Sequence, residues 1–364
     1  MGTRRPTPAE RERAWMKRAL ALARRGWGQT VPNPMVGAVV VRAGRIVGEG
    51  YHARFGSAHA EVVALAKAGA KARGATVFVT LEPCAHWGKT PPCTDALIAA
   101  GVARVVCAVR DPGGHSGGGA RKLRRAGIVV EFGLEAEAAR ELNAAFFFVH
   151  TAPGRPWVTL KIALSADGAV ARRGKRRATI TAAAANREVH RMRAQSDAIA
   201  IGIGTALADD PDLTVRLVRL PRVPPVRVVF DRRSRLPLKS RLVASAMRVP
   251  TVVVAAAKAP RRELKLFRKG VEVLHARTLG RALQLLVRHD VRALLVEAGP
   301  GMAKAFLAAR VVDRIVIFRA PRRLGAGAIA AFDNASFLDR FRVVARHRFG
   351  PDVMTVYDPR ARMT

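Results

Sequence analysis

Two of the three cysteines in this 364-residue chain lie in one proline-bounded loop, TLEPCAHWGKTPPC at 80–93. The loop overlaps the end of an apolar run, ATVFVTL at 75–81, which is typical of a buried strand. A separate segment, SAHAEVVAL at 57–65, places a histidine at the start of an expected helix. If these side chains share one ligand, the fold must bring the two segments together.

The three side chains are His59, Cys84 and Cys93, and they offer the nitrogen and thiolate donors that tetrahedral zinc prefers. Three protein ligands leave one position for water, whose pKa a catalytic zinc lowers to about 7. Glu61 follows the histidine, and His-Ala-Glu before Pro-Cys and a later cysteine is the zinc-deaminase signature, in which the glutamate carries protons and is not a ligand. The alternative is two structural thiols and a surface histidine.

Each of these cysteines follows a proline, Pro83 or Pro92. Proline is common at the start of a helix, where the backbone dipole favours a thiolate. We therefore expect Cys84 and Cys93 each to lie at a helical N-terminus.

Composition limits the class of protein. An apolar fraction of 49% with both charge signs indicates a folded chain, long enough for two domains. A net charge of +37 favours anionic partners, but the basic residues are scattered, so a solvated surface is preferred to a nucleic-acid site. We find no apolar stretch of membrane-spanning length and no signal peptide, so we expect a cytoplasmic protein with reduced thiols.

Strand and helix patterns alternate along the chain, which indicates an α/β fold. MVGAVVVRAGRIVGEGYH at 35–52 predicts a hairpin turning at residues 43–44. A Pro/Gly stretch at 152–156 predicts a boundary between a first domain, 1–150, and a second, 151–364. In the second domain we expect strands near 157–164, 197–201, 226–230, 250–255, 292–297 and 313–319.

Eight residues, AHWGKTPP, separate the two cysteines, whereas many nucleoside deaminases have Cys-x-x-Cys. This loop resembles that of the pyrimidine deaminase half of the bifunctional riboflavin-biosynthesis deaminase/reductase. The likeness extends over residues 14–112 and includes PNPMVGAVVV at 32–41, GEGYHARFG at 48–56 and DALIAAGVARVV at 95–106. It implies a cytidine-deaminase-like α/β/α sandwich in which His59, Cys84 and Cys93 hold zinc and Glu61 is the catalytic proton shuttle.

The same resemblance implies a set of residues that hold the pyrimidine and its ribose phosphate: Asn33, His52, His86 and Lys89. An amide can read a pyrimidine edge, and a lysine offers a point charge to phosphate. Asn33, which lies between prolines, is alternatively a turn residue. The family pattern D-P-N-P is replaced by DPGGHSGGG at 111–119, so Gly113 stands where the family has a phosphate-contacting asparagine. Either backbone N–H groups of this glycine-rich loop replace that donor, or the substrate phosphate is bound more weakly.

The second domain resembles the reductase half of the same enzyme, which has a dihydrofolate-reductase-like fold. The matching segments are KIALSADG at 161–168, residues 189–216 and VEAGPGMAKAFL at 296–307. A glycine-rich turn from strand to helix can present N–H groups to phosphate. The resemblance implies an NADPH site made by Ala163, Thr205, Asp209, Gly299, Pro300, Gly301, Met302, Ala303, Lys304 and Ala305. It assigns Arg193, Leu213, Arg216 and Glu297 to the substrate, and two arginines suit a ribose phosphate.

This half also departs from the family pattern. In RATIT at 177–181, Thr179 replaces the tryptophan of the nicotinamide pocket, and Arg177 replaces a substrate-side serine. Arg232 replaces another serine after the strand at 226–231, where it is placed to bind the 2′-phosphate of NADP. The alternative is a slow or inactive reductase.

These features predict a two-step enzyme of riboflavin biosynthesis. Its first step deaminates 2,5-diamino-6-ribosylamino-4(3H)-pyrimidinone 5′-phosphate with zinc. Its second reduces the ribosyl chain with NADPH, giving 5-amino-6-ribitylamino-uracil 5′-phosphate. A small phosphorylated pyrimidine is the expected partner, with a homo-oligomer as the expected assembly and neither nucleic acid nor membrane expected. A tRNA-type nucleic-acid deaminase, a deaminase with an impaired reductase half and a non-enzymatic zinc scaffold are the alternatives.

Overall fold

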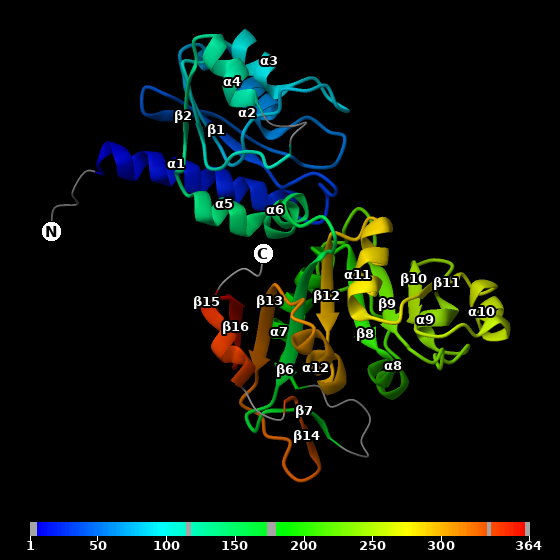
Figure 1. Cartoon of the computed structure of the whole chain (residues 1–364). Helices are drawn as coiled ribbons and strands as arrows, with labels where there is room; N and C mark the ends of the chain where they lie inside the picture. Colours follow the sequence, from blue (N-terminus) through cyan, green and yellow to red (C-terminus); the bar gives the residue numbers. More distant parts are fainter. Residues whose placement is uncertain (1–5, 114–117, 173–179, 333–335, 361–364) are drawn as a thin grey trace. The chain divides into compact units, whose positions relative to one another are not determined.

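The computed structural model describes residues 6–113, 118–172, 180–332 and 336–360 (Figure 1). The chain divides into two compact units, Met1–Thr151 and Ala152–Thr364. In the described residues, no helix has both the length and the apolar character needed to span a membrane.

The first unit is built on one mixed sheet with strand order β2-β1-β3-β4-β5. β1 pairs antiparallel with β2 and β3, and β3, β4 and β5 run parallel. The predicted hairpin is confirmed, because β1 and β2 join at Ala43 and Gly44, whose φ angles of 48° and 74° suit a tight turn. The strands are β1 Gly37–Arg42, β2 Arg45–Tyr51, β3 Thr76–Val79, β4 Arg104–Cys107 and β5 Val129–Phe132.

Helices cover both faces of this sheet (Figure 1). Val40, Val77 and Val105 face α2, α3 and α4, whereas Val39 and Phe78 face α1 and α5, as the two-residue period of a strand requires. The predicted α/β/α sandwich is therefore confirmed. The helices are α1 Pro8–Ala23, η1 Arg24–Gly26, α2 Ala60–Ala68, η2 Gly69–Ala72, α3 Cys93–Ala99, α4 Gly119–Arg125, α5 Ala136–Leu142 and α6 Ala144–Thr151.

The second unit has a nine-stranded sheet of order β11-β10-β9-β8-β12-β6-β13-β16-β15. The seven strands from β11 to β13 run parallel, and β16 and β15 follow antiparallel. The six strands predicted here are confirmed. The strands are β6 Trp157–Leu164, β8 Ala198–Gly202, β9 Val226–Phe230, β10 Thr251–Ala255, β11 Val271–His275, β12 Ala293–Glu297, β13 Arg314–Arg319, β15 Phe341–Phe349 and β16 Asp352–Pro359, with β7 Ala169–Arg172 and β14 Ala328–Ala330 in a separate small sheet.

Helices lie between successive strands and cover their apolar side chains. They are α7 Ala183–Ala194, α8 Ile203–Asp209, α9 Arg241–Ala244, α10 Pro260–Phe267, α11 Leu279–Arg288, α12 Pro300–Ala308 and η3 Ser336–Arg340. Because the central strands are parallel, their carboxyl ends share one edge of the sheet. This is the edge at which open α/β sheets bind ligands.

Candidate functional site

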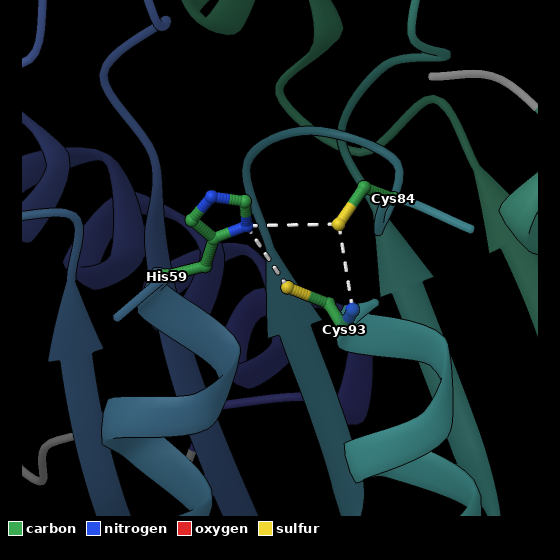
Figure 2. Close-up of side chains that lie close together, drawn as sticks. All are labelled: His59, Cys84 and Cys93. Carbon is green, nitrogen blue, oxygen red and sulfur yellow. Dashed lines mark hydrogen bonds between the residues drawn. The ribbon is translucent and has the colours of Figure 1, made fainter. Parts of the chain in front are cut away.

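The three predicted zinc donors converge at the carboxyl edge of the first sheet (Figure 2). His59 is the N-cap of α2, Cys93 is the first residue of α3, and Cys84 lies in the loop after β3. Nδ1 of His59 lies 3.2 Å from Sγ of Cys93 and 3.6 Å from Sγ of Cys84. The helical N-terminus predicted for Cys93 is therefore confirmed, and the one predicted for Cys84 is wrong, because its loop must turn back toward α3.

The donor set fits zinc. With Zn–S near 2.3 Å and Zn–N near 2.0 Å, tetrahedral geometry separates a nitrogen from a sulfur ligand by about 3.5 Å. The observed distances match, and all three donor atoms lie within 4.8 Å of one another. Hydrogen bonding to Cys93, together with His59, holds the pKa of the Cys84 thiol well below its usual range, despite burial. A thiolate, the form that binds metal, is therefore favoured at Cys84.

Thr90 is a partner of His59 that the sequence reasoning missed. Its Oγ1 lies 3.5 Å from Nε2 of His59, on the ring edge opposite the two sulfurs. A metal-bound histidine usually donates its second ring N–H to an oxygen, which fixes the ring orientation. The TPP run before Cys93 was the available signal.

Glu61 lies in the first turn of α2 and is only 3% exposed. Burial raises the pKa of its carboxyl to about 7, against the opposing effect of His59. Among the described residues, the donor cluster contains His59, Cys84 and Cys93 and leaves Glu61 out. The geometry thus presents a carboxyl that can exchange protons beside a three-donor site.

Two of the four predicted pyrimidine contacts adjoin the cluster. His52 is 2% exposed, and its ring packs edge-on against His59 with centroids 5.1 Å apart. Nδ2 of Asn33 lies 3.3 Å from Nε2 of His52. His86 and Lys89 are exposed on the 84–93 loop, where Nζ of Lys89 lies 4.5 Å from the centre of the Phe55 ring.

Gly113, at the family's asparagine position, uses its N–H internally. It donates to Oδ1 of Asp111 at 2.8 Å. Nearby, the buried Glu82 carboxylate accepts from the N–H groups of Asp111 and Ala120 at 3.3 and 2.9 Å. The Gly113 N–H is therefore not a substitute for the missing amide, and residues 114–117 of the same glycine-rich loop lie outside the described residues.

In the second unit, the turn into α12 lies beside α8. Gly299 is the N-cap of α12, and a Cβ on it would lie 3.3 Å from Oγ1 of Thr205. A Cβ on Gly202 would lie 2.7 Å from Cγ of Met302, so both glycines permit close approach of these segments. A Cβ on Gly301 would meet no atom within 4 Å.

The first N–H groups of a helix have no acceptor within it, and they favour an anion. The open space at Gly301 lets a phosphate approach these groups closely, so the start of α12 fits a dinucleotide phosphate. Within the predicted segment, Ala303 is buried in the core, whereas Lys304 and Ala305 are exposed.

The remaining predicted cofactor residues follow the same edge. Ala163 lies near the carboxyl end of β6, Asp209 ends α8, and Arg232 is exposed after β9. Arg177 and Thr179 lie outside the described residues.

Arg193 and Glu297 form a buried ion pair. Nε and Nη2 of Arg193 donate to the two carboxylate oxygens at 2.5 and 2.9 Å, and Nη1 donates to the Thr214 carbonyl at 3.0 Å. Arg193 is 6% exposed, whereas the Arg216 side chain is 50% exposed. Of the two predicted phosphate arginines, Arg216 is the one that offers an open guanidinium. Leu213 packs its side chain into the apolar core.

Lys161 and His190 are two residues of this region that the sequence reasoning missed. Lys161 interrupts the apolar strand WVTLKIAL and is the register partner of Glu297 on β12. His190 is buried in α7, one turn before Arg193. The lysine was visible as a charge within a central strand, whereas nothing in the sequence distinguished the histidine.

Comparisons with known proteins address both units. Residues 9–109 match the cytidine and deoxycytidylate deaminase zinc-binding region, and residues 156–355 match the RibD C-terminal domain. The riboflavin biosynthesis protein RibD of Aquifex aeolicus is 44% identical over 321 residues, 87% of this chain and 89% of its own length. That of Escherichia coli is 40% identical over 358 residues, 93% and 97% of the two chains.

The chain belongs to the RibD family. Its structure is similar to Acinetobacter baumannii RibD, with a TM-score of 0.84 and 37% identity over 97% of this chain and 100% of that one. A deaminase/reductase from Thermotoga maritima gives a TM-score of 0.85 and 35% identity over the same shares. The predicted fold is confirmed, a cytidine-deaminase-like domain followed by a dihydrofolate-reductase-like one. As a RibD protein, this chain is a bifunctional enzyme of riboflavin biosynthesis, a zinc-dependent deaminase and an NADPH-dependent reductase.

Proposed function

We propose that the chain deaminates 2,5-diamino-6-ribosylamino-4(3H)-pyrimidinone 5′-phosphate and then reduces the product to 5-amino-6-ribitylamino-uracil 5′-phosphate. The observation that carries this proposal is the His59, Cys84 and Cys93 cluster with Glu61 buried beside it. The second unit supports it with a helix start that suits a phosphate, at α12, and with the exposed guanidinium of Arg216. When bound, zinc supplies an activated water and NADPH supplies a hydride.

In the deaminase half, Glu61 carries a proton from the attacking water to the departing ammonia. Its burial suits this role, because a carboxyl with a pKa near the working pH both accepts and donates protons. His59, Cys84 and Cys93 hold the metal, and Thr90 orients the His59 ring.

The pyrimidine and its phosphate occupy two sides of this site. Asn33 and His52, which contact each other next to His59, read the polar edge of the base. His86 and Lys89 reach the ribose phosphate from the exposed loop, with the Lys89 ammonium as a point charge.

In the reductase half, the start of α12 and Thr205 hold the NADPH phosphates, and Ala163, Asp209, Lys304 and Ala305 line the cofactor, while the buried Ala303 packs α12 against the sheet. Arg232 lies at the adenosine end of the cofactor. Arg216 binds the ribose phosphate, while the buried Arg193–Glu297 pair forms the wall beside the sugar. Thr179 and Arg177 belong to the nicotinamide and substrate sides by their positions in the family pattern, although both differ in residue type from it.

We also propose that the enzyme works in the cytoplasm as a homo-oligomer. Reduced thiols at the zinc cluster suit that compartment. The edge strand β15 exposes Val343 and Val344 and offers an unpaired surface for a second copy. Analytical ultracentrifugation tests the oligomer.

The direct test supplies the purified chain with the diaminopyrimidine phosphate and measures ammonia release and NADPH oxidation separately. We expect the chain to release ammonia in the absence of NADPH. Once NADPH is added, we expect the NADPH to be oxidised. Ammonia release without any later NADPH oxidation would mean that only the deaminase half is active. Release of ammonia from tRNA but not from the pyrimidine would contradict the proposal.

A further inference from the structure

The segment 210–216, here called the substrate loop, carries Arg216 and has a strained backbone. Asp210 and Leu213 have φ angles of 37° and 53°, in the left-handed region that non-glycine residues rarely adopt. Such conformations persist when the surroundings hold them in place. The contacts that fix this loop therefore matter for where Arg216 points.

Two buried side chains of α7 bind the backbone of the substrate loop. Nδ1 of His190 accepts the N–H of Arg216 at 3.1 Å, and Nη1 of Arg193 donates to the carbonyl of Thr214 at 3.0 Å. Residues 190 and 193 are three apart on the helix and so share one face. In an extended chain, the carbonyl of one residue and the N–H two residues later point to the same side, as in a parallel ladder. The two side chains thus take the place of a neighbouring strand.

The fixed backbone in turn places the Arg216 side chain. Its Nη1 donates to Oδ2 of Asp212 at 3.1 Å and to Oγ1 of Thr214 at 3.2 Å, both within the same loop. Half of the side chain stays exposed. The guanidinium is therefore held by the loop itself. Arg227 and Arg241 bind the first part of the loop, at residues 210 and 212, and the hydrogen bonds to α7 fix its last part, at residues 214 and 216.

We propose that His190 is a positioning residue of the reductase, whose unprotonated Nδ1 holds Arg216 where it meets the substrate phosphate. The imidazole is 2% exposed, so its ring fills space in the core and also supplies one acceptor to one backbone N–H. His190 itself does not reach the substrate in this account. The inference rests on the proposed role of Arg216 as the phosphate ligand.

Two substitutions at His190 distinguish the effect of its hydrogen-bond acceptor from the effect of its side-chain shape. His190→Asn keeps an acceptor close to the Nδ1 position, whereas His190→Leu has nearly the shape of Asn and no acceptor. Loss of the acceptor lets the loop relax and weakens phosphate binding in the ground state and the transition state alike. Such a loss raises KM and leaves kcat nearly unchanged. We expect KM for the phosphorylated reductase substrate to rise about 10-fold or more in His190→Leu. This is the usual contribution of a charge-assisted hydrogen bond, here the one between Arg216 and the substrate phosphate.

The experiment measures KM and kcat of NADPH oxidation with 5-amino-6-(5-phosphoribosylamino)uracil and with its dephosphorylated form. Ammonia release by the same chain controls for enzyme concentration, and NADPH binding controls for folding of the reductase half. The inference predicts a KM near wild type for His190→Asn, a raised KM for His190→Leu, and no difference between the two variants with the dephosphorylated compound. Equal KM values for both variants with the phosphorylated substrate would overturn it.

Two further variants keep the outcomes distinct. Should His190→Leu fail to bind NADPH, His190→Gln replaces it, because its amide lies farther from the backbone than Nδ1 and cannot meet the same N–H. Arg216→Ala tests the proposed function on its own. An unchanged KM in Arg216→Ala would show that the arginine does not bind the phosphate, whereas a raised KM there with unchanged KM in the acceptor-less His190 variant would overturn the positioning role alone.

Discussion

Gly50 of β2 controls the position of the zinc site because α2 packs directly against it. A Cβ at this residue would lie 2.2 Å from the carbonyl oxygen of Ala60 and 2.6 Å from the nitrogen of Ala64. Both neighbours are backbone atoms of α2, so Gly50→Ala requires the helix or the strand to move by about 1 Å to restore contact distances. Overpacking of this kind costs about 1–3 kcal/mol, and more where backbone atoms clash.

The displaced turn of α2 holds a zinc donor and the proton carrier, because Ala60 lies between His59 and Glu61. Displacements of about 1 Å can lower a rate about 10²-fold, so we expect Gly50→Ala to lose much of its ammonia release and to hold less zinc. NADPH oxidation with the deaminated intermediate should stay normal, since α2 belongs to the other unit. Metal analysis, the two activity assays and a thermal melt give the result.

Gly280→Ala is the matched control, because a Cβ at Gly280 meets no atom within 4 Å. It should leave both activities and the zinc content unchanged. Full zinc occupancy and normal ammonia release in Gly50→Ala would refute the steric reasoning.

Three further predictions follow from the described contacts. Cys84→Ser removes one of the three donors, so zinc bound per chain should fall sharply on metal analysis; unchanged zinc would exclude this ligand set. Arg193→Met removes the two hydrogen bonds that Arg193 donates to the largely buried Glu297 carboxylate and should lower unfolding stability by about 1.5–3 kcal/mol in denaturant titrations; a loss under about 0.5 kcal/mol would mean that these bonds contribute little to stability. The Ser165 hydroxyl and the N–H groups of Gly325 and Leu324 lower the pKa of Asp167. This carboxylate therefore stabilises the fold above its unfolded pKa of about 3.9, and the stabilisation is lost as the pH falls through the folded pKa. Asp167→Asn should make thermal stability less dependent on pH on the acid side, and an unaltered pH dependence would contradict this.

The deaminase centre could be predicted from the sequence because its chemistry fixes residue types at short spacings. A histidine starting a helix and two cysteines bounding a proline-rich loop specify a metal whatever their environment, and the structure brings all three together. The hairpin was equally clear, because two residues of turn type separate two apolar runs.

Features that depend on long-range packing were not visible in the sequence. Arg193 matched a substrate position, but only the fold shows that its Nε and Nη2 groups both donate to Glu297, at the end of β12. The Gly113 N–H was free in the sequence interpretation and binds Asp111 in the structure. Strand β15 was missed because it is exposed along most of its length, and an edge strand in water carries no two-residue apolar pattern.

The central claim is that Glu61 carries the proton of the deamination while the metal is held without it. Zinc content and ammonia release of Glu61→Gln, measured on the same preparation, test this most directly. The account predicts unchanged zinc, ammonia release lower by about 10²–10⁴-fold, and normal NADPH oxidation with the deaminated intermediate. Near-normal ammonia release by Glu61→Gln, or loss of zinc with the carboxylate, would contradict it.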